Sequence, residues 1–454
     1  MRQIKQSQPT LREPGIHHEH REELQTIDRI LRENPTIFQF VDQDLKKNTR
    51  YSCAGRKGMT AEQVVKAALI KQLHGFSYKV LYFHLLDSRT FSEFVGFGMF
   101  DSVPRRSTLA DNIKKISFET WEKIHRIVMG VAQKKGVEKW TRIRTDATVV
   151  ASSIHHPSDS SLLWDCVRVL TRILNEAKAL KPDEIRFTDH TRRAKRRYLG
   201  IINAKNAEIR QNRYKDLFRV TRKVLNEAAV AIGVFRDCIV DCPQGDSHRK
   251  MQPLCTELLH FHALGHRVLD QATRRVIHKQ SVPSQEKIVS IFESHTDIVV
   301  KGNRDPEYGH KIYLSGSNSG LVVDCIVESG NPADSQEFET ILNRFGTLYE
   351  RMPRKLVLDG CFASKDNLGR AKSMGIEDIV FSKKRGIPVH KMVSSTWKYK
   401  CLRNFRAGVE GLISYLKNSF GLKRCNWKGF ESFKSYVLCS MLTHNLLILA
   451  RHLM

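Results

Sequence analysis

The sequence predicts an α/β protein in which a mixed β-sheet is interrupted by a large helical insertion and preceded by an all-α domain. Four observations, taken in chain order, lead to this fold class. Residues 58–135 carry apolar side chains at helical spacing, and residues 141–150 alternate as a strand does. Residues 158–295 return to long helical patterns, and β-rich runs reappear from residue 298 onward. This order of elements is typical of a sheet with a helical domain inserted into it.

The region before the first strand divides into a charged N-terminal segment, residues 1–57, and a small helical domain, residues 58–135. The segment contains one short helical patch, around Leu24–Leu31. In the domain, the hydroxyl of Thr60 and the side-chain amide of Gln63 have the spacing of a capping box, which predicts a helix start.

Basic side chains flank a later helix of this domain, expected at residues 107–116 with Ser107 as its N-cap. Arg105 and Arg106 come directly before it and are candidate DNA-binding residues. The domain is therefore either a helix-turn-helix variant that contacts DNA or a helical cap or dimerisation module without DNA contact. The sequence leaves both interpretations open.

The composition points to a polyanionic partner. The chain of 454 residues has 75 Lys and Arg against 48 Asp and Glu, a formal charge of +27. Nucleic acid is the favoured partner over a membrane, because the apolar run Phe433–Met454 is interrupted by polar residues and resembles a buried core helix. The N-terminus has no apolar export signal, and the ten cysteines are scattered, as in a reduced cytoplasmic protein.

The first strand is expected at Thr141–Val150. One face of it carries Ile143, Thr145, Ala147 and Val149. Asp146 therefore points to the opposite face, partway along the strand. An isolated strand aspartate is more often a solvated residue. Asp146 is therefore a candidate catalytic residue only in combination with the acids described below.

The insertion, residues 158–295, is basic and helical. Its periodicity predicts three long helices, at residues 162–180, 188–231 and 254–277, with a break across Pro243–Pro253. The middle helix has many more bases than acids, whereas ordinary solvated helices mix the signs. We therefore expect it to face phosphate groups. The candidate DNA-binding residues at its start are Arg192, Arg193, Arg196 and Arg197.

Strand patterns return after the insertion. A short strand at 298–300 is followed by a hairpin, residues 311–327, and by a helix from Asn331 to about Tyr349. The apolar run Lys355–Leu358 then stops at Asp359. Functional groups gather at the carboxyl ends of strands in open α/β sheets, so Asp359 is a second candidate acid.

A helix near the C-terminus, within residues 403–424, carries the third acid. At helical pitch Arg403, Arg406, Glu410 and Lys417 form one stripe, while an apolar stripe lies on another side. Taken alone, the Arg406–Glu410 spacing is an ordinary surface ion pair. Together with the two strand aspartates, Glu410 completes a trio of carboxylates of the kind that holds two Mg²⁺ ions.

These acids lie in blocks that resemble those of DDE transposases of bacterial insertion sequences, enzymes with an RNase H-like catalytic core. The first block is the strand around Asp146, and the second is Leu358–Gly360 with Asn367 downstream. Residues 156–163 and the turn at 331–334 resemble the ISNCY group of these enzymes. The resemblance extends from about residue 58 to residue 450.

The third block, Arg406-x3-Glu410-x6-Lys417, resembles the signature around the last acid of many such enzymes. That signature has a tyrosine three residues before the arginine, where this chain has Arg403. The resemblance implies a catalytic core made of residues 140–157 and 296–454. It also implies that Arg406 and Lys417 bind DNA near the reacting phosphate. Arg403, on the same stripe, departs from the signature and is a candidate DNA-binding residue by its charge alone.

The resemblance implies a bacterial, cytoplasmic, nucleoid-associated transposase that binds the terminal inverted repeats of its element. Asp146, Asp359 and Glu410 would be its catalytic residues and the ligands of two Mg²⁺ ions, for which Mn²⁺ can substitute. Water would attack the phosphodiester at each end, and the released 3′-OH would join target DNA. The expected partners are double-stranded DNA and a second copy of the chain. The alternatives are a non-catalytic DNA-binding protein and a metal-dependent DNA nuclease without strand transfer.

Overall fold

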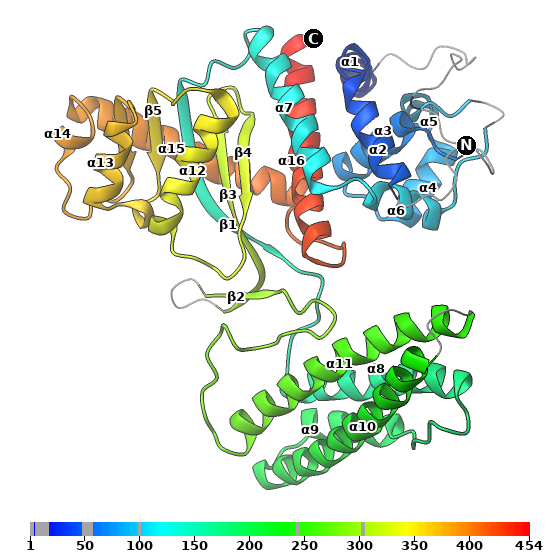
Figure 1. Cartoon of the computed structure of the whole chain (residues 1–454). Coiled ribbons are helices and arrows are strands. Elements are labelled where there is room, and N and C mark those ends of the chain that lie inside the picture. Colours follow the sequence, from blue (N-terminus) through cyan, green and yellow to red (C-terminus); the bar gives the residue numbers. More distant parts are fainter. Residues whose placement is uncertain (1–3, 5–17, 48–57, 99–100, 242–245, 301–304) are drawn as a thin grey trace. The chain divides into compact units, whose positions relative to one another are not determined.

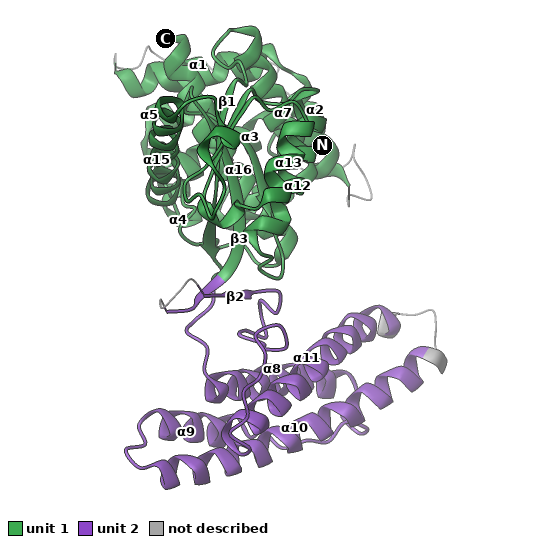
Figure 2. Ribbon diagram, turned by 90° about the vertical axis from the view of Figure 1, so that its left-hand side faces the viewer, with its two compact units in different colours: residues 1–153, 309–454 green, residues 154–308 purple. Residues whose placement is uncertain are grey.

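The chain forms two compact units (Figure 2). The computed structural model describes residue 4 and residues 18–47, 58–98, 101–241, 246–300 and 305–454. The first unit comprises residues 1–153 and 309–454, and the second comprises residues 154–308. The second unit is thus inserted into the sequence of the first, and it contains the stretch expected as the helical insertion.

The first unit begins with helices. Among the described residues these are α1 (Glu19–Glu33), α2 (Thr36–Lys46), α3 (Ala61–Leu73), α4 (Tyr78–Asp87), α5 (Arg89–Val95), α6 (Arg106–Lys114) and α7 (Phe118–Lys134). The apolar side chains of α1 and α2, such as Leu31 and Phe38, are buried in the same core as those of α3. Helical packing therefore starts at Glu19, within the stretch that the sequence presents as a charged segment.

The expected capping box is present, whereas the expected cap of α6 is not. The Thr60 hydroxyl accepts a hydrogen bond from the Gln63 amide at 3.1 Å, and the Gln63 side chain accepts one from the Thr60 amide at 3.0 Å. The prediction that Ser107 is an N-cap is wrong. Arg105 is the extended residue that precedes α6, and its carbonyl already accepts a hydrogen bond from the amide of Leu109.

A mixed sheet forms the centre of the first unit (Figure 1). Its strands are β1 (Arg142–Ala151), β3 (Glu307–Ser317), β4 (Val322–Val327), β5 (Lys355–Leu358) and β6 (Asp378–Phe381). The strand β2 (Asp297–Val299) belongs to the same sheet, whose order is β2–β3–β1–β5–β6, and β4 also pairs with β3. Strand β3 is antiparallel to both β1 and β4, whereas β5 runs parallel to β1 and β6 runs parallel to β5. This confirms the α/β class with a mixed sheet.

Helices cover both faces of this sheet. They are α12 (Asp334–Tyr349), the 3₁₀ turn η1 (Gly360–Phe362), α13 (Lys365–Ser373), α14 (Val389–Met392), α15 (Thr396–Ser419) and α16 (Phe430–Leu453). The Tyr313 hydroxyl bonds to Asp334 at the start of α12, and Tyr313 pairs with Ala147 of β1. Arg144 lies three positions before Ala147 on β1, so its side chain points to the opposite face of the sheet. There it bonds to Phe405 of α15. Helix α15 therefore covers the face to which Arg144 and Asp146 point.

The apolar C-terminal stretch is a core helix, as the sequence predicts. By length and composition α16 is the one helix among the described residues that passes as a membrane span, but 89% of its apolar window is buried inside the protein. It packs against α1, α3, α7 and β4. The side-chain amide of Asn445 bonds to the backbone of Val322, which explains a polar residue at the centre of this helix.

The second unit is a helical assembly with its own apolar core. It contains α8 (Asp159–Leu180), α9 (Thr191–Ile202), α10 (Ala207–Asp241), α11 (Asp246–Val276) and the short strand β2 (Asp297–Val299). The prediction of one helix over residues 188–231 is wrong: the side chain of Asn206 accepts a hydrogen bond from the Glu208 amide and starts a new helix. The break expected at Pro253 is also absent, since α11 continues through it. Pro243 lies outside the described residues.

Candidate active site

Two of the candidate acids are placed side by side by the pairing of parallel strands. Thr145 of β1 lies opposite Leu358 of β5, and these are the last paired residues of that ladder. Asp146 and Asp359 are the next residue on each strand. The Asp146 carboxylate also accepts a hydrogen bond from the amide of Ala147 at 2.8 Å. The backbone register therefore brings both aspartates to the same edge of the sheet.

The third acid is delivered by helix α15. The hydroxyl of Ser395 caps the start of this helix, and the buried side chains of Leu402, Val409 and Leu416 hold it on β1, β5 and β6. Glu410 follows Val409 and lies at the edge of the buried stripe, so its carboxylate is 66% exposed. The helix thus supplies an accessible carboxylate to the edge where the strand aspartates lie.

Arg406 joins the three acids. Its Nη2 lies 2.9 Å from Oδ2 of Asp146 and 3.2 Å from Oδ1 of Asp359, and its Nη1 lies 2.9 Å from Oε1 of Glu410. The Arg406, Asp146 and Asp359 side chains are at most 28% exposed. One guanidinium therefore contacts all three carboxylates, and we call these four residues the acid cluster.

Ser382 orients Asp359 from the neighbouring strand. Its hydroxyl donates to Oδ1 of Asp359 at 2.7 Å and accepts from the Gly360 amide at 2.9 Å. Burial raises the pKa of Asp359, but the hydrogen bonds from Ser382 and the Gly360 amide and the charge of Arg406 outweigh it and lower the pKa. Asp359 is therefore ionised at neutral pH. Sequence reasoning missed Ser382, although it directly follows β6, which is paired in parallel with β5.

Arg144 supports α15 beneath the acid cluster. It lies two residues before Asp146 on the same strand face, its Nη1 donates to the carbonyl of Phe405 at 2.9 Å, and its guanidinium lies 4.6 Å from the Phe405 ring centre. A Cβ at Gly408 would lie 2.0 Å from Nη1 of Arg144. Glycine at position 408 therefore lets this arginine fit under the helix. The sequence shows Arg144 only as another base near an acid.

The other predicted DNA-binding residues of the first unit lie outside the acid cluster. Arg403 and Lys417 are on α15 with Glu410, and Arg403 is exposed. Arg105 and Arg106 are exposed at the start of α6. Among the bases predicted in this unit, Arg406 is the one that contacts all three acids in the described part of the chain.

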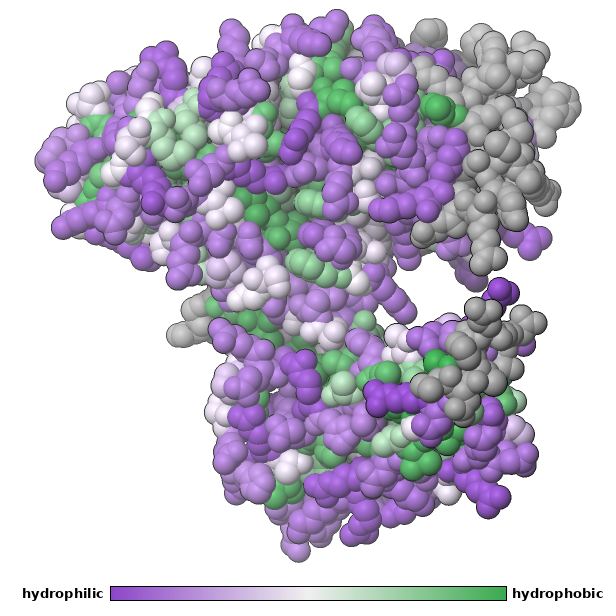
Figure 3. Space-filling model, in the orientation of Figure 1, coloured by the Kyte–Doolittle hydropathy of each residue, from purple (hydrophilic) through white to green (hydrophobic). Residues whose placement is uncertain are grey.

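The four predicted arginines of the second unit all lie on α9 but differ in their partners. Arg193 and Arg197 both form ion pairs with Asp216 of α10. Arg192 and Arg196 are exposed, and the described chain provides no carboxylate for either. The face seen in Figure 3 is largely hydrophilic over the helices of this unit. Arg192 and Arg196 are therefore the two that are free to meet an external anion.

The donor set of the acid cluster suits hard divalent cations, which prefer carboxylate oxygens. As they stand, no three acidic, His or Cys side chains among the described residues form a metal site. The guanidinium of Arg406 contacts the carboxylates of Asp146, Asp359 and Glu410. A set of acids that already surrounds one cation fits the divalent metal expected from the sequence.

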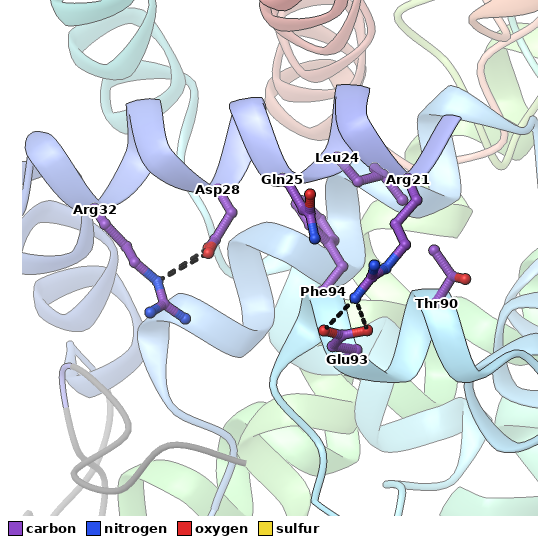
Figure 4. Close-up of a pocket in the computed structure, with 8 residues that line it drawn as sticks. All are labelled: Arg21, Leu24, Gln25, Asp28, Arg32, Thr90, Glu93 and Phe94. Atoms are coloured by element: carbon purple, nitrogen blue, oxygen red, sulfur yellow. Dashed lines mark hydrogen bonds and ion pairs between the residues drawn. The ribbon is translucent and has the colours of Figure 1, made fainter. Parts of the chain in front are cut away.

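A separate cavity of about 280 Å³ lies between α1 and α5 (Figure 4). It is lined by Arg21, Leu24, Gln25, Asp28, Arg32, Thr90, Glu93 and Phe94. Arg21 pairs with Glu93 at 3.2 Å and Arg32 pairs with Asp28 at 3.0 Å. The first pair joins α1 to α5 and the second lies within α1, so the charges that line the cavity neutralise one another, and we assign the cavity a structural role.

Comparison with protein families gives two matches. Residues 16–115 match the Transposase domain (DUF772), and residues 311–446 match the Transposase DDE domain. The first range contains α1 to α6, and the second contains Asp359, Arg406 and Glu410. No curated protein and no solved structure matches the chain significantly. The strand order described above agrees with the RNase H-like core that the sequence predicts. With both matched ranges spanning just over half of its length, the chain belongs to the DDE transposases of insertion sequences, enzymes that cut and join DNA.

Proposed function

We propose that this transposase binds the terminal inverted repeats of its element, hydrolyses the phosphodiesters at both ends and joins the 3′-OH groups to target DNA. The observation that carries the proposal is the acid cluster, in which Asp146, Asp359 and Glu410 meet at one guanidinium. The three acids come from the middle of β1, the end of β5 and helix α15, so they are held by the fold and not by one flexible loop.

Asp146, Asp359 and Glu410 would hold two Mg²⁺ ions, or Mn²⁺ in their place. Bound there, such ions supply electrostatic stabilisation of the attacking and leaving oxygens of a phosphodiester. The chain itself keeps Asp359 ionised through Ser382 and the Gly360 amide. It keeps Asp146 beside Asp359 through the β1–β5 register.

Basic residues around the cluster would bind the DNA backbone. Arg403 and Lys417 lie on the same helix as Glu410, on either side of it in sequence. Arginine forms bidentate hydrogen bonds with phosphate, and lysine supplies a compact charge. We assign both residues, with Arg406, to the phosphates that flank the scissile bond.

Two further regions would hold DNA away from the acid cluster. In the helical domain, residues 58–135, the exposed Arg105 and Arg106 precede α6. In the basic insertion, residues 158–295, α9 presents its exposed arginines. The large net positive charge of the chain supports a role for both regions in phosphate binding.

We also propose that two copies act together, because an element has two ends that must be joined in concert. A dimer would place one acid cluster at each end. Mixing an Asp359→Asn subunit with a subunit carrying Arg105→Ala and Arg106→Ala tests this arrangement. Restored cleavage would show action in trans, whereas a cleavage-competent complex with the mass of one subunit on one end would contradict the dimer.

The main test is substitution of the acids. Asp146→Asn, Asp359→Asn and Glu410→Gln should each abolish cleavage of a terminal-repeat duplex in Mg²⁺ while leaving binding to that duplex largely unchanged. Pre-cut ends and a target plasmid then separate joining from cutting. Near wild-type cleavage by one variant would remove that residue from the catalytic set. Cleavage without joining would point to a nuclease.

A further inference from the structure

We propose that Arg406 acts as an internal counter-cation that holds the acid trio in the DNA-free protein and opposes metal binding until DNA phosphate draws it away. The inference rests on the proposed metal-binding role of the acids. It goes beyond that role, because it makes one residue of α15 the link between DNA binding and metal binding.

The contacts of Arg406 support this assignment. Its two terminal nitrogens are engaged by three carboxylates at 2.9–3.2 Å, which is the distance of charge-assisted hydrogen bonds. The same oxygens are the ones a divalent cation would need. Guanidinium and metal therefore compete for one set of ligands.

The position of Arg406 also has an unfavourable element. Its Nε is buried and has no hydrogen-bond partner among the residues that the structure describes. An unsatisfied buried donor destabilises the arrangement in which it occurs. In addition, one of the three ion pairs is made to Glu410, which is 66% exposed and therefore weakly held in water. The guanidinium is thus retained by charge but is not locked in place.

DNA offers Arg406 a better partner. A phosphate diester accepts two parallel hydrogen bonds from one guanidinium, in a geometry that arginine matches well. When Arg406 turns to a phosphate beside the cluster, the three carboxylates are left close together without their cation. Their mutual repulsion then favours a divalent cation, so DNA raises metal affinity. By linkage the metal raises DNA affinity by the same factor.

The experiment measures Mn²⁺ binding to the full-length protein by calorimetry without DNA. Arg406→Gln removes the guanidinium charge and should bind Mn²⁺ at least five-fold more tightly than the wild type, the lower end of common coupling factors. Arg403→Gln is the matched control: it removes the same charge from the same helix, three residues away. It should change the Mn²⁺ affinity less than two-fold, because no DNA is present for Arg403 to bind.

A second measurement adds a terminal-repeat duplex. Wild-type protein should gain Mn²⁺ affinity on DNA binding, whereas Arg406→Gln, already without its internal cation, should gain little. Far-ultraviolet circular dichroism checks that each variant is folded. Unchanged or weaker Mn²⁺ binding by a folded Arg406→Gln would overturn the proposal, and so would an equal rise in both arginine variants.

Asp359→Asn distinguishes failure of this inference from failure of the proposed function. If it weakens Mn²⁺ binding in the wild-type background while Arg406→Gln has no effect, the acids bind metal and only the role of Arg406 is refuted. If Mn²⁺ binding is insensitive to Asp359→Asn both in the wild type and in Arg406→Gln, the acids are not the metal site and both proposals fail.

Discussion

Replacing Arg344 with methionine is expected to destabilise the first unit strongly, because it leaves a buried carboxylate without its partner. Nε of Arg344, on α12, lies 2.9 Å from both oxygens of Asp324 on β4. A terminal nitrogen of the same guanidinium bonds to Glu122 on α7. One side chain therefore connects the N-terminal helices with the sheet that carries the acid cluster.

The burial of the pair sets the magnitude. The Asp324 side chain is 4% exposed and that of Arg344 is 27% exposed. Removing one partner of a buried ion pair costs about 3–5 kcal/mol, and the partial exposure of Arg344 places this case near the lower end, at about 3 kcal/mol. Methionine retains most of the aliphatic volume, so the loss reports the charge and not a cavity.

The loss should depend on pH. Burial raises the pKa of Asp324, and the charge of Arg344 counteracts it. Without Arg344 the folded-state pKa rises further above the unfolded value, so the folded variant binds more protons between the two values. Its stability therefore falls as the pH rises through that window. The variant should lose more stability at pH 8 than at pH 5.

Urea unfolding followed by circular dichroism measures the effect, with Arg354→Met as the matched control. Arg354 contacts both carboxylate oxygens of Glu377 at 2.9 and 3.0 Å, but this pair is solvent-exposed and its loss should change stability only slightly. Adding Asp324→Asn to Arg344→Met should recover part of the loss by removing the buried charge. Equal effects of the two arginine substitutions, or no recovery in the double variant, would refute the reasoning.

Three further predictions follow from other contacts. Burial lowers the pKa of His125 and of His444 to about 4, so both imidazoles are neutral in the folded state. The stabilisation linked to each neutral imidazole is complete above about pH 6.5 and is lost as the pH falls toward 4. At pH 5 the loss in the free energy of unfolding is on the order of 2 kcal/mol for each histidine. The difference between the urea midpoints at pH 7.5 and pH 5 should be smaller in His125→Gln and in His444→Gln than in the wild type. An unchanged pH dependence in these variants would contradict the prediction. Neutralising Arg192 and Arg196 should flatten the dependence of DNA affinity on salt, by roughly 0.9 in the slope of log affinity against log salt concentration per lost phosphate contact. Neutralising Arg193 and Arg197, which pair with Asp216, should flatten it less. Equal slopes for the two double variants would mean that the ion pairs with Asp216 open when DNA binds. Gly408→Ala should lower stability because its Cβ displaces Arg144, whereas Gly411→Ala, whose Cβ meets nothing within 4 Å, should stabilise α15 by about 0.5–1 kcal/mol in the same unfolding assay.

The sheet and the position of the two aspartates follow from local patterns. The alternation around Asp146 and the short apolar run that stops at Asp359 depend on neighbours in sequence, so the side of the strand and the strand end are readable directly. The capping box at Thr60 and the buried C-terminal helix are readable for the same reason. The break between α9 and α10 cannot be read from the sequence. The apolar periodicity around Asn206 is the same whether this residue caps a helix, as it does here, or lies within one.

The partners of the charged residues depend on tertiary contacts and could not be read in the same way. Arg406 and Glu410 show helical spacing, but that spacing is also typical of a surface pair. The contacts of Arg406 with Asp146 and Asp359 join residues more than 40 positions apart in sequence and need the register of β1 and β5. The pairing of Asp216 with Arg193 and Arg197 likewise depends on how α9 packs on α10.

The acid cluster therefore has a fixed part and an adjustable part. Asp146 and Asp359 belong to neighbouring strands whose backbone hydrogen bonds leave little freedom. Glu410 is carried by α15, whose position depends on side-chain contacts such as Arg144 with Phe405 and Leu412 against Gly316. Because Arg406 is on this same helix and bonds to both strand aspartates, its release would change the restraint on Glu410 as well as the local charge. If Arg406 is released as we propose, the site would respond to DNA through α15, while the strands keep the two aspartates in place.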